Sequence, residues 1–434
     1  MLSKNALKTK NGRLLAFSLL YLSEGIPFGF SAIALATHLR MSGVGLTEIG
    51  LFTASLYAPW GFKWAWAPLV DLIKFKRFGA KRTWIATAQA AMIGTLGIVV
   101  FFDYSTNIQL LTTLIIIHNI FAATQDVAID ALAIKVLPEN ERGIANGFMF
   151  GSSYLGQAIG GSGALLIAGK FGFEFSFPFV LLALTLILVF VTLRLQEPAE
   201  PITEKIQSGV SVFQEILRQM KLFLKELYLG FFKSGTGPLV GVAFSLLPFG
   251  ALALGLVLGS AIQVDLGMDE NQIAKLTMFG TVFAAAGCII GGWISDRVGH
   301  RKALGVWYVL TTIPTFFLAR QFIGVEGTAG VTIDLFFYVS IAYSFASGLQ
   351  QGTSTAVFMG LTSPAVAATQ FTGYMALHNF VYSYSSLWQG KYADIHGYAK
   401  VLFMDGWIAF IPLILLPFLK PRKQAVELTN NGPQ

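Results

Sequence analysis

The stretch Ile26-Pro27-Phe28-Gly29 lies inside the first long apolar segment of the chain, and it returns 221 positions later as Leu247-Pro248-Phe249-Gly250. Two more pairs repeat in the same order, at offsets of 225 and 226 residues: Asp71 with Asp296, and Gln125 with Gln351. Each match is weak by itself, but three ordered matches at nearly one offset indicate an internal duplication. The sequence therefore predicts a fold of two related halves.

The composition places the chain among integral membrane proteins. Of its 434 residues, 54% are apolar and 12% are charged, whereas a soluble globular chain carries about 25% charged residues. A membrane-spanning helix needs about 20 mostly apolar residues, so the apolar content allows about twelve spans and little else. A soluble enzyme and a disordered regulator are therefore disfavoured. The single cysteine, Cys288, excludes an intrachain disulfide.

Twelve apolar segments are expected to form helices. They lie at about 14–39, 47–70, 83–102, 108–136, 144–168, 174–194, 237–263, 271–295, 303–323, 331–358, 367–388 and 399–419. The predicted fold class is all-α and integral to the membrane, with 12 transmembrane helices in two six-helix bundles related by pseudo-two-fold symmetry. In the fifth segment and the residue before it, Gly143, Gly147 and Gly151 form a small-xxx-small ladder that predicts close approach of a neighbouring helix.

The basic residues indicate which side of the membrane holds the termini. If the N-terminus is cytoplasmic, 23 of the 30 Lys and Arg residues fall in cytoplasmic segments, 6 fall outside, and Lys63 lies within a span. The positive-inside rule therefore places both termini in the cytoplasm. It also accounts for the net charge of +7 without a nucleic-acid partner. The apolar run from Leu14 to Ala36 is too long for a signal peptide and is interpreted as an uncleaved first span.

The longest polar stretch separates the sixth segment from the seventh. Apolar residues from Phe213 to Leu227 recur there at helical spacing, with Lys221 and Lys225 between them, which predicts an amphipathic helix on the cytoplasmic membrane surface. The expected organisation is an N-terminal bundle (1–194), a cytoplasmic linker (195–235), a C-terminal bundle (236–420) and a cytoplasmic tail (421–434).

The fourth segment carries two acids, Asp126 and Asp130, one helical turn apart. They therefore share a helix face. A charge at the bilayer centre costs about 2.5–3.5 kcal/mol on insertion scales, and neighbouring carboxylates raise each other's proton affinity. With Glu24 and Lys63 as candidate partners, these residues are the predicted proton-coupling group. The alternative is a static Lys63–Asp pair that only fixes helix packing.

The remaining polar residues inside the spans are candidates for lining a substrate cavity. In the first half they are His118, Asn119 and Gln125, and in the second half Gln350, Gln351, Tyr374, His378 and Asn379. The acids of the second half, Asp334 and Asp405, lie near predicted span ends and are not assigned to this group. Ordinary hydrogen bonding between helices is the alternative interpretation. No metal site is predicted.

The segment Gly292-Trp-Ile-Ser-Asp296-Arg297-Val-Gly299-His300-Arg301-Lys302 resembles motif A of the major facilitator superfamily. A degenerate copy in the first half contains Asp71 and Arg77. A carboxylate at a helix end can cap the N-terminus of a neighbouring helix, and an adjacent Arg can hold it. The resemblance implies a gating latch of Gly292, Asp71, Arg77, Asp296, Arg297 and Arg301 that stabilises the outward-open state. The alternative is a pair of basic cytoplasmic loops.

Three stretches of the first half resemble one branch of that superfamily, the AmpG-type muropeptide permeases, which group with acetyl-CoA transporters and certain siderophore importers. These stretches are Tyr21–Gly29, Phe62–Asp71 and Ala123–Gly143, and Thr124-Gln-Asp-Val-Ala-Ile-Asp130 is the most diagnostic. The resemblance implies a monomeric, multi-pass importer of the bacterial inner membrane, driven by the proton gradient without a cofactor. It maps the coupling acids of the family onto Asp126 and Asp130 and its second-span lysine onto Lys63.

The resemblance supports the mechanism better than the substrate. An anhydromuropeptide is the first candidate and a siderophore the alternative, since the start of the chain is equally similar to the siderophore branch. Two other classes were weighed. An intramembrane prenyltransferase would use paired Asp-x-x-x-Asp motifs, of which the chain has one. A receptor on a transporter fold would need an appended signalling domain, for which no segment is evident.

Overall fold

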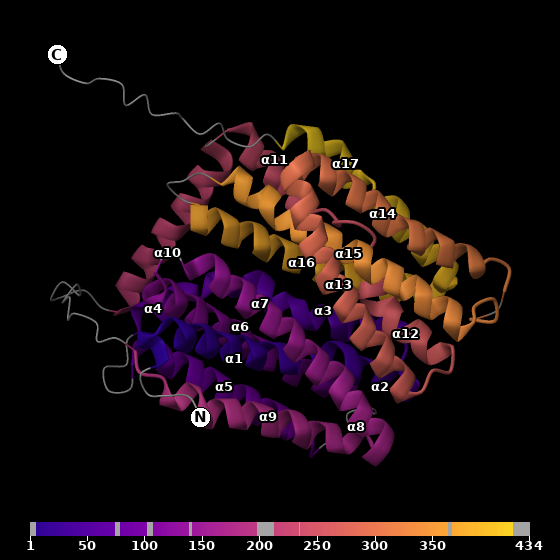
Figure 1. Ribbon diagram of the computed structural model, residues 1–434, viewed down its shortest axis with the longest axis horizontal. Coiled ribbons are helices and arrows are strands. Elements are labelled where there is room, and N and C mark those ends of the chain that lie inside the picture. The colour runs from indigo at the N-terminus through magenta and orange to yellow at the C-terminus, as the bar shows by residue number, and fades with distance from the viewer. Residues whose placement is uncertain are drawn as a thin grey trace.

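The computed structural model describes residues 6–73, 79–101, 107–138, 141–197, 212–233, 235–325, 327–362 and 367–419. Within these residues every element of regular secondary structure is a helix, and Figure 1 shows the helices in two adjoining groups, one from each half of the sequence. The all-helical fold class is therefore confirmed.

The first group contains the helices before residue 195. They are α1 (Lys10–Gly29), α2 (Ala36–Met41), α3 (Leu46–Phe62), α4 (Ala67–Leu72), α5 (Ala80–Val99), α6 (Ile108–Val136), α7 (Arg142–Ala158), α8 (Ala164–Phe171) and α9 (Ser176–Phe190). Two wider π-helical turns, Phe30–Leu35 and Ile159–Gly163, join α1 to α2 and α7 to α8. Each joined pair therefore forms one long, slightly irregular rod.

The second group follows the linker helix α10 (Val212–Tyr228), which a wider turn, Leu229–Lys233, extends. Its helices are α11 (Thr236–Ser245), α12 (Val257–Asp265), α13 (Glu270–Val298), α14 (His300–Gln321), α15 (Ile333–Leu361), α16 (Ala367–Ile408) and α17 (Ile411–Leu415). Gly397, at φ 76°, divides α16 into two helices. α13 begins with a capping box on Asp269.

Six helical stretches of the described chain are long and apolar enough to cross a membrane by length and composition. Two of the predicted segments were expected to be continuous helices, and the structure shows that each is interrupted. The segment 47–70 breaks at a short turn, Lys63–Ala65, between α3 and α4. The segment 237–263 is open between Ser245 and Val257 apart from one short turn, Ala253–Gly255.

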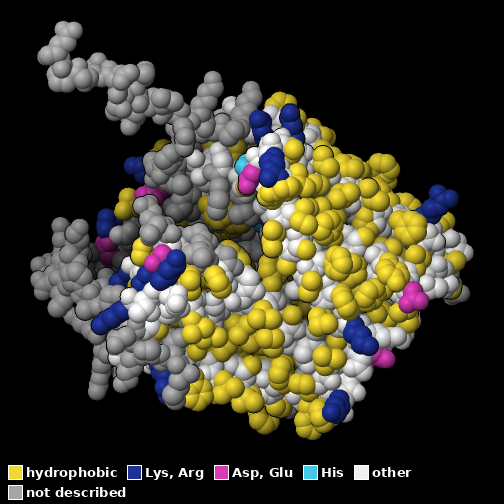
Figure 2. Space-filling view, viewed as in Figure 1, with side chains coloured by type: hydrophobic (Ala, Val, Ile, Leu, Met, Phe, Trp, Pro, Cys, Tyr) yellow, Lys and Arg dark blue, Asp and Glu magenta, His cyan; other side chains and the backbone are white. Residues whose placement is uncertain are grey.

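Large apolar side chains cover the outer flank of the helices (Figure 2), and many of them are more than a third exposed. Soluble monomers rarely expose so wide an apolar surface to water, but the hydrocarbon interior of a bilayer can cover it. Six examples spread over six helices are Leu15, Phe148, Leu182, Val282, Ile313 and Ile414. The outer surface therefore fits lipid.

Close packing of α1 on α7 depends on glycine. A Cβ on Gly156 would lie 2.7 Å from the Leu22 carbonyl oxygen, and one on Gly160 would overlap the Ile26 backbone. Gly151, which the sequence placed in the ladder, instead has open space around it. A close approach therefore exists, at Gly156 and Gly160 and not at Gly151. Gly143 and Gly147 lie outside the residues whose side-chain positions the structure describes.

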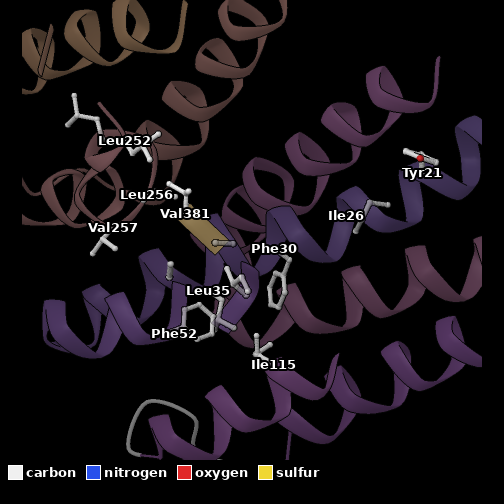
Figure 3. Close-up of a cluster of buried hydrophobic side chains, with 14 of the residues drawn as sticks. Tyr21, Ile26, Phe30, Leu35, Phe52, Ile115, Leu252, Leu256, Val257 and Val381 are labelled. Atoms are coloured by element: carbon white, nitrogen blue, oxygen red, sulfur yellow. The ribbon is translucent and has the colours of Figure 1, made fainter. Parts of the chain in front are cut away.

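At one end of the molecule the two groups share a single apolar core. Figure 3 shows Phe30, Leu35, Phe52 and Ile115 of the first group in one apolar cluster with side chains of the second. Leu252, Leu256, Val257 and Val381 are second-group members of this cluster. α3 packs along α16, and α2 packs on α12. This end is therefore closed by apolar contact.

Polar contacts reinforce the same end, and we call this set the clasp. Arg40, in the last turn of the first rod, bonds Asp265 of the second group through two pairs, Nη2–Oδ2 at 2.5 Å and Nε–Oδ1 at 2.8 Å. Tyr398 donates to the same carboxylate at 2.6 Å. Asp394 accepts from the Leu46 and Thr47 N–H groups, which open α3, so the carboxylate caps a helix of the other half.

The other end is different. Figure 2 shows the surface hollowed between the two groups, toward the side on which α10 lies in Figure 1. There α10 contacts α4 of the first group and α16 of the second. The molecule is therefore closed at the clasp end and open at the α10 end.

Candidate functional site

The central polar contact joins α3 to α6. Lys63 begins the short turn that ends α3, and its Nζ lies 2.5 Å from Oδ2 of Asp126. The two side chains are 16% and 9% exposed. Trp60, one turn earlier, places its ring 5.4 Å from the same Nζ. The break in the second predicted span thus carries a cation into the middle of the first group.

The second acid of α6 has a different partner. Asp130 accepts a hydrogen bond of 2.6 Å from the Tyr21 hydroxyl of α1. The two carboxylates lie one turn apart on α6, as the spacing predicted, but only Asp126 contacts Lys63 at hydrogen-bond distance among the described residues. Loss of Lys63 would therefore affect the two acids unequally.

Glu24 of α1 completes the group that we call the acid cluster: Glu24, Lys63, Asp126 and Asp130. It is 6% exposed, and its Oε1 has no hydrogen-bond partner among the described residues. It interacts electrostatically with all three other members. Three carboxyl groups therefore share one ammonium in an interior where unpaired charge is costly.

The three remaining first-half candidates are all buried but differ in their partners. Gln125 donates to Ser23 Oγ at 2.8 Å, and its Oε1 is buried without a partner among the described residues. Asn119 accepts from the Trp60 indole at 3.3 Å. His118 lies 3.2 Å from both Thr95 and the Met92 carbonyl, so it joins α5 to α6. Of the three, only Gln125 has unused hydrogen-bonding capacity of this kind.

Two of the second-half candidates, His378 and Gln350, also carry a buried polar atom without a partner among the described residues. His378 stacks on Phe249 at 4.4 Å and meets Phe358 edge-on at 4.8 Å, while its Nε2 is buried without a partner in the described chain. Gln350 Nε2 is also buried and unpaired there. Gln351 and Asn379 are half-buried.

Tyr374 departs from the expectation of a cavity residue. It is fully buried, and its hydroxyl donates to the Pro238 carbonyl at 3.0 Å. Its ring also packs on Phe231 and Phe358. Tyr374 therefore fixes α16 to α11 and does not offer its hydroxyl to a ligand in this state.

Four aromatic rings link the halves between the acid cluster and the second-half residues. Tyr57 of α3 stacks on Tyr382 of α16 at 4.8 Å. Phe28 meets Tyr57 edge-on at 5.5 Å, and Phe249 meets Tyr382 edge-on at 4.8 Å. Phe28 and Phe249 are the phenylalanines of the repeated four-residue stretch, so the duplication places one ring on each side of a shared stack.

Asp405 was missed by the sequence analysis, which placed it near a span end. It is 1% exposed. One oxygen accepts from the Leu252 and Ala253 N–H groups at 2.8 and 3.0 Å, and the other accepts from Gln389 at 3.0 Å. These N–H groups belong to the open stretch between α11 and α12. The available signal in the sequence was an acid within the last apolar segment. The open stretch that Asp405 stabilises has no equivalent in the first half, so the duplication did not point to it.

The described part of the gating motif lies at the end of α13 and the start of α14. Asp296 is 74% exposed, and its nearest ionic partner among the described residues is His300 at 3.8 Å. Arg297 lies over the Trp293 ring at 3.5 Å, and Arg301 reaches the Pro417 carbonyl at 3.4 Å. Gly292 lies at the contact of α13 with α15. Among the described residues, Asp296, Arg297 and Arg301 therefore make no ion pair with one another, and the latch stays a prediction. The Asp71 side chain and Arg77 lie outside the described residues.

Comparison with known proteins agrees with this architecture. The family model described as Major Facilitator Superfamily matches residues 14–387. The chain is 23% identical to a Rickettsia conorii protein named putative transporter AmpG 4, with 94% of this chain and 95% of that one covered. It is also 23% identical to the anhydromuropeptide permease of Escherichia coli K12, over 94% and 80% of the two chains. The resemblance drawn from the first-half motifs is thereby confirmed.

Solved structures give the same fold. The crystal structure of a D-xylose-proton symporter aligns with 93% of this chain and 97% of its own, with a TM-score of 0.69 at 14% identity. A likeness at so low an identity concerns the arrangement of helices alone.

Proposed function

Since this chain belongs to the Major Facilitator Superfamily, a family of membrane transporters and not of enzymes, we propose that it imports a solute by proton-coupled alternating access. We propose twelve spans, with both termini and α10 in the cytoplasm of a bacterium and the clasp toward the periplasm. The protein would work as a monomer, without a cofactor or metal, in the inner membrane.

The observation that carries this proposal is the acid cluster. Lys63 neutralises one of its three carboxyl groups, and two further bare charges inside a membrane protein would be costly. A proton held by the cluster removes part of that cost. Proton loading from one side and release to the other would therefore change the charge between α1, α3 and α6.

The two ends support a direction for the cycle. The clasp and the shared apolar core close one end, while the other end is hollowed. On the proposed topology this is an inward-facing state, and an exposed Asp296 fits a latch that forms only in the outward-facing state. Proton and substrate would enter after the clasp opens and leave at the α10 end.

The proposed substrate is an anhydromuropeptide, because a relative that matches most of the chain is named as a permease for it. Sugar rings and amide groups suit the second-half residues. His378, Gln350 and Gln125 each carry a buried polar atom without a partner among the described residues, and such atoms favour a ligand that pairs them. The aromatic stack beside them offers flat faces for sugar rings.

Uptake of labelled anhydromuropeptide tests the whole proposal. Cells that express the protein should accumulate the label, and an uncoupler should abolish accumulation. No uptake, in cells where the protein is present in the membrane, would contradict the muropeptide assignment and direct the same assay to a ferric siderophore.

Asp126→Asn tests the coupling role against the static-pair alternative. A coupling acid predicts that the variant loses uphill uptake, yet still exchanges labelled for unlabelled substrate across the membrane. A static pair predicts that uphill uptake and exchange fall together, along with the amount of folded protein. Asp334→Asn is the matched control, since Asp334 is an exposed acid in the first turn of α15, and it should leave both activities unchanged.

A further inference from the structure

The linker helix α10 presents an exposed apolar stripe. Phe213, Leu217, Leu224 and Tyr228 are between 45% and 67% exposed. At about 100° of rotation per residue they fall within about 60° of arc, so they form one line along the helix. A stripe of this kind needs an apolar partner, which nothing in the described chain supplies.

The charges on α10 are sorted around that stripe. Lys221 and Lys225 follow its edge, at about 80° and 120° from Phe213. Arg218 lies beyond them, paired with Glu215 at 2.5 Å. The acids Glu215 and Glu226 lie on the far side, at about 200° and 220°. The apolar stripe therefore has a basic border on one side, and the acids are kept away from it.

The face of α10 beside the stripe, at about 320° from Phe213, and the turn that follows α10 are attached to the protein, which fixes the direction of the stripe. Leu227 and Phe231 pack on Gly373 of α16, where a Cβ would lie 2.7 Å from the Phe231 ring. Gln370 donates to the Gly230 carbonyl at 2.5 Å. Figure 1 shows α10 running along one end of the molecule past both groups of helices. The stripe therefore cannot rotate inward without loss of these contacts.

Aromatic residues mark the end of the stripe. Tyr228 and Phe232 stack at 5.5 Å, and both rings are 52% exposed. Tyrosine is enriched where a protein meets the boundary between lipid and water, since its ring is apolar and its hydroxyl is polar. Together with the basic border, this pair has the chemistry that suits a membrane surface.

We propose that α10 is a lipid-binding helix whose apolar stripe enters the bilayer surface and whose Lys221 and Lys225 bind anionic phospholipid headgroups. Each basic residue near an anionic surface contributes about 1 kcal/mol, which is about fivefold in an equilibrium. Docking of α10 should therefore be about 25-fold more favourable with both lysines than without them. This inference goes beyond transport and is tested without a substrate.

The experiment uses the full chain in nanodiscs. Cys288 is replaced by Ser, and Leu224→Cys carries an environment-sensitive fluorophore. Nanodiscs of phosphatidylcholine are compared with nanodiscs in which about one third is phosphatidylglycerol, each with quenchers on the upper acyl chain. The expected result is strong quenching that increases with the anionic lipid. The same label at Glu226→Cys, on the polar face, should stay unquenched.

Lys221→Glu/Lys225→Glu should abolish the dependence on anionic lipid. The matched control is Lys275→Glu/Lys391→Glu, which makes the same change of net charge at two exposed lysines away from α10. Raised salt on the unaltered protein should weaken the dependence through screening, which keeps the test valid even if a charge variant misfolds. Equal quenching in the two lipid mixtures, or equal quenching at positions 224 and 226, would overturn the proposal.

Discussion

The repeated four-residue stretch has opposite structures in the two halves. Ile26–Gly29 lies within α1, which stays helical through Pro27. Leu247–Gly250 lies in the open stretch between α11 and α12, where Gly250 adopts φ 96°. The four repeated residues therefore do not determine their own local structure. The helices packed around them do.

The residues at the helix contacts of the two repeated stretches differ in side-chain size. Gly25 and Gly29 face the backbone of α7 around Ser153 and Gln157, and Gly156 and Gly160 face α1 in return. At the offsets of the duplication, Gly25 corresponds to Leu246 and Gly156 to Tyr382. Gly29 and Gly160 correspond to Gly250 and Ser386, so large side chains stand at two of the four positions. They leave less room for the same close approach, and a straight helix would gain less from packing there.

The open stretch instead gains hydrogen bonds from side chains. Asp405 accepts from Leu252 and Ala253, Thr311 accepts from the Ala251 N–H, and Tyr343 donates to the Ala251 carbonyl. Buried backbone groups need such partners. One half thus uses its buried acids in a cluster that shares a lysine, while the other uses its buried acid to hold a broken helix.

The largest expected effect is at Asp405. Asp405→Ala leaves two buried N–H groups and the Gln389 amide without an acceptor, at about 1–3 kcal/mol for each lost partner. We expect a loss of about 3–5 kcal/mol of stability, measured as a lower thermal unfolding midpoint in detergent. Asp405→Asn keeps one oxygen and should recover part of the loss. If the two variants lower the unfolding midpoint by the same small amount, Asp405 does not stabilise the open stretch between α11 and α12.

The next effect concerns the glycine contact of the first half. Gly160→Ala should cost about 1–3 kcal/mol, because a methyl group would overlap the Ile26 backbone and force α1 from α7. Gly151→Ala on the neighbouring α7 is the control, since a Cβ there meets nothing within 4 Å. It should be neutral or stabilising by up to about 1 kcal/mol. Equal unfolding midpoints for the two variants would mean that close packing does not keep α1 straight.

The smallest effect is at Thr311. Thr311→Val keeps the shape of the side chain but removes the acceptor of the Ala251 N–H, at a cost of about 1 kcal/mol. Thr312→Val is the control, because the Thr312 hydroxyl bonds only within its own helix among the described residues. Calorimetry of both variants should separate them. A larger loss at position 312 would argue against Thr311 as a support of the break.

The sequence predicts the all-helical fold class, because long apolar segments can be recognised from the order of residues alone. It also selects Lys63, Asp126, Asp130 and Glu24, since charges inside apolar runs are conspicuous. It misses Asp405, whose partners are backbone groups exposed only by a break in another helix. It assigns Tyr374 to a cavity because a hydroxyl has the same appearance in sequence whether it faces a ligand or a carbonyl.

The clasp gives the two ends of the molecule different sensitivities to electrolyte. Arg40 and Asp265 are 19% and 26% exposed, so water and dissolved ions reach their charges. The screening length falls from about 8 Å at physiological ionic strength to about 3 Å at 1 M salt, which weakens exposed ion pairs but leaves apolar contacts intact. On the proposed topology the clasp faces the compartment whose salinity follows the growth medium. A saltier medium would therefore shift substrate-free transporters toward the outward-facing state. The fraction of transporters that can bind external substrate would then depend on external salinity.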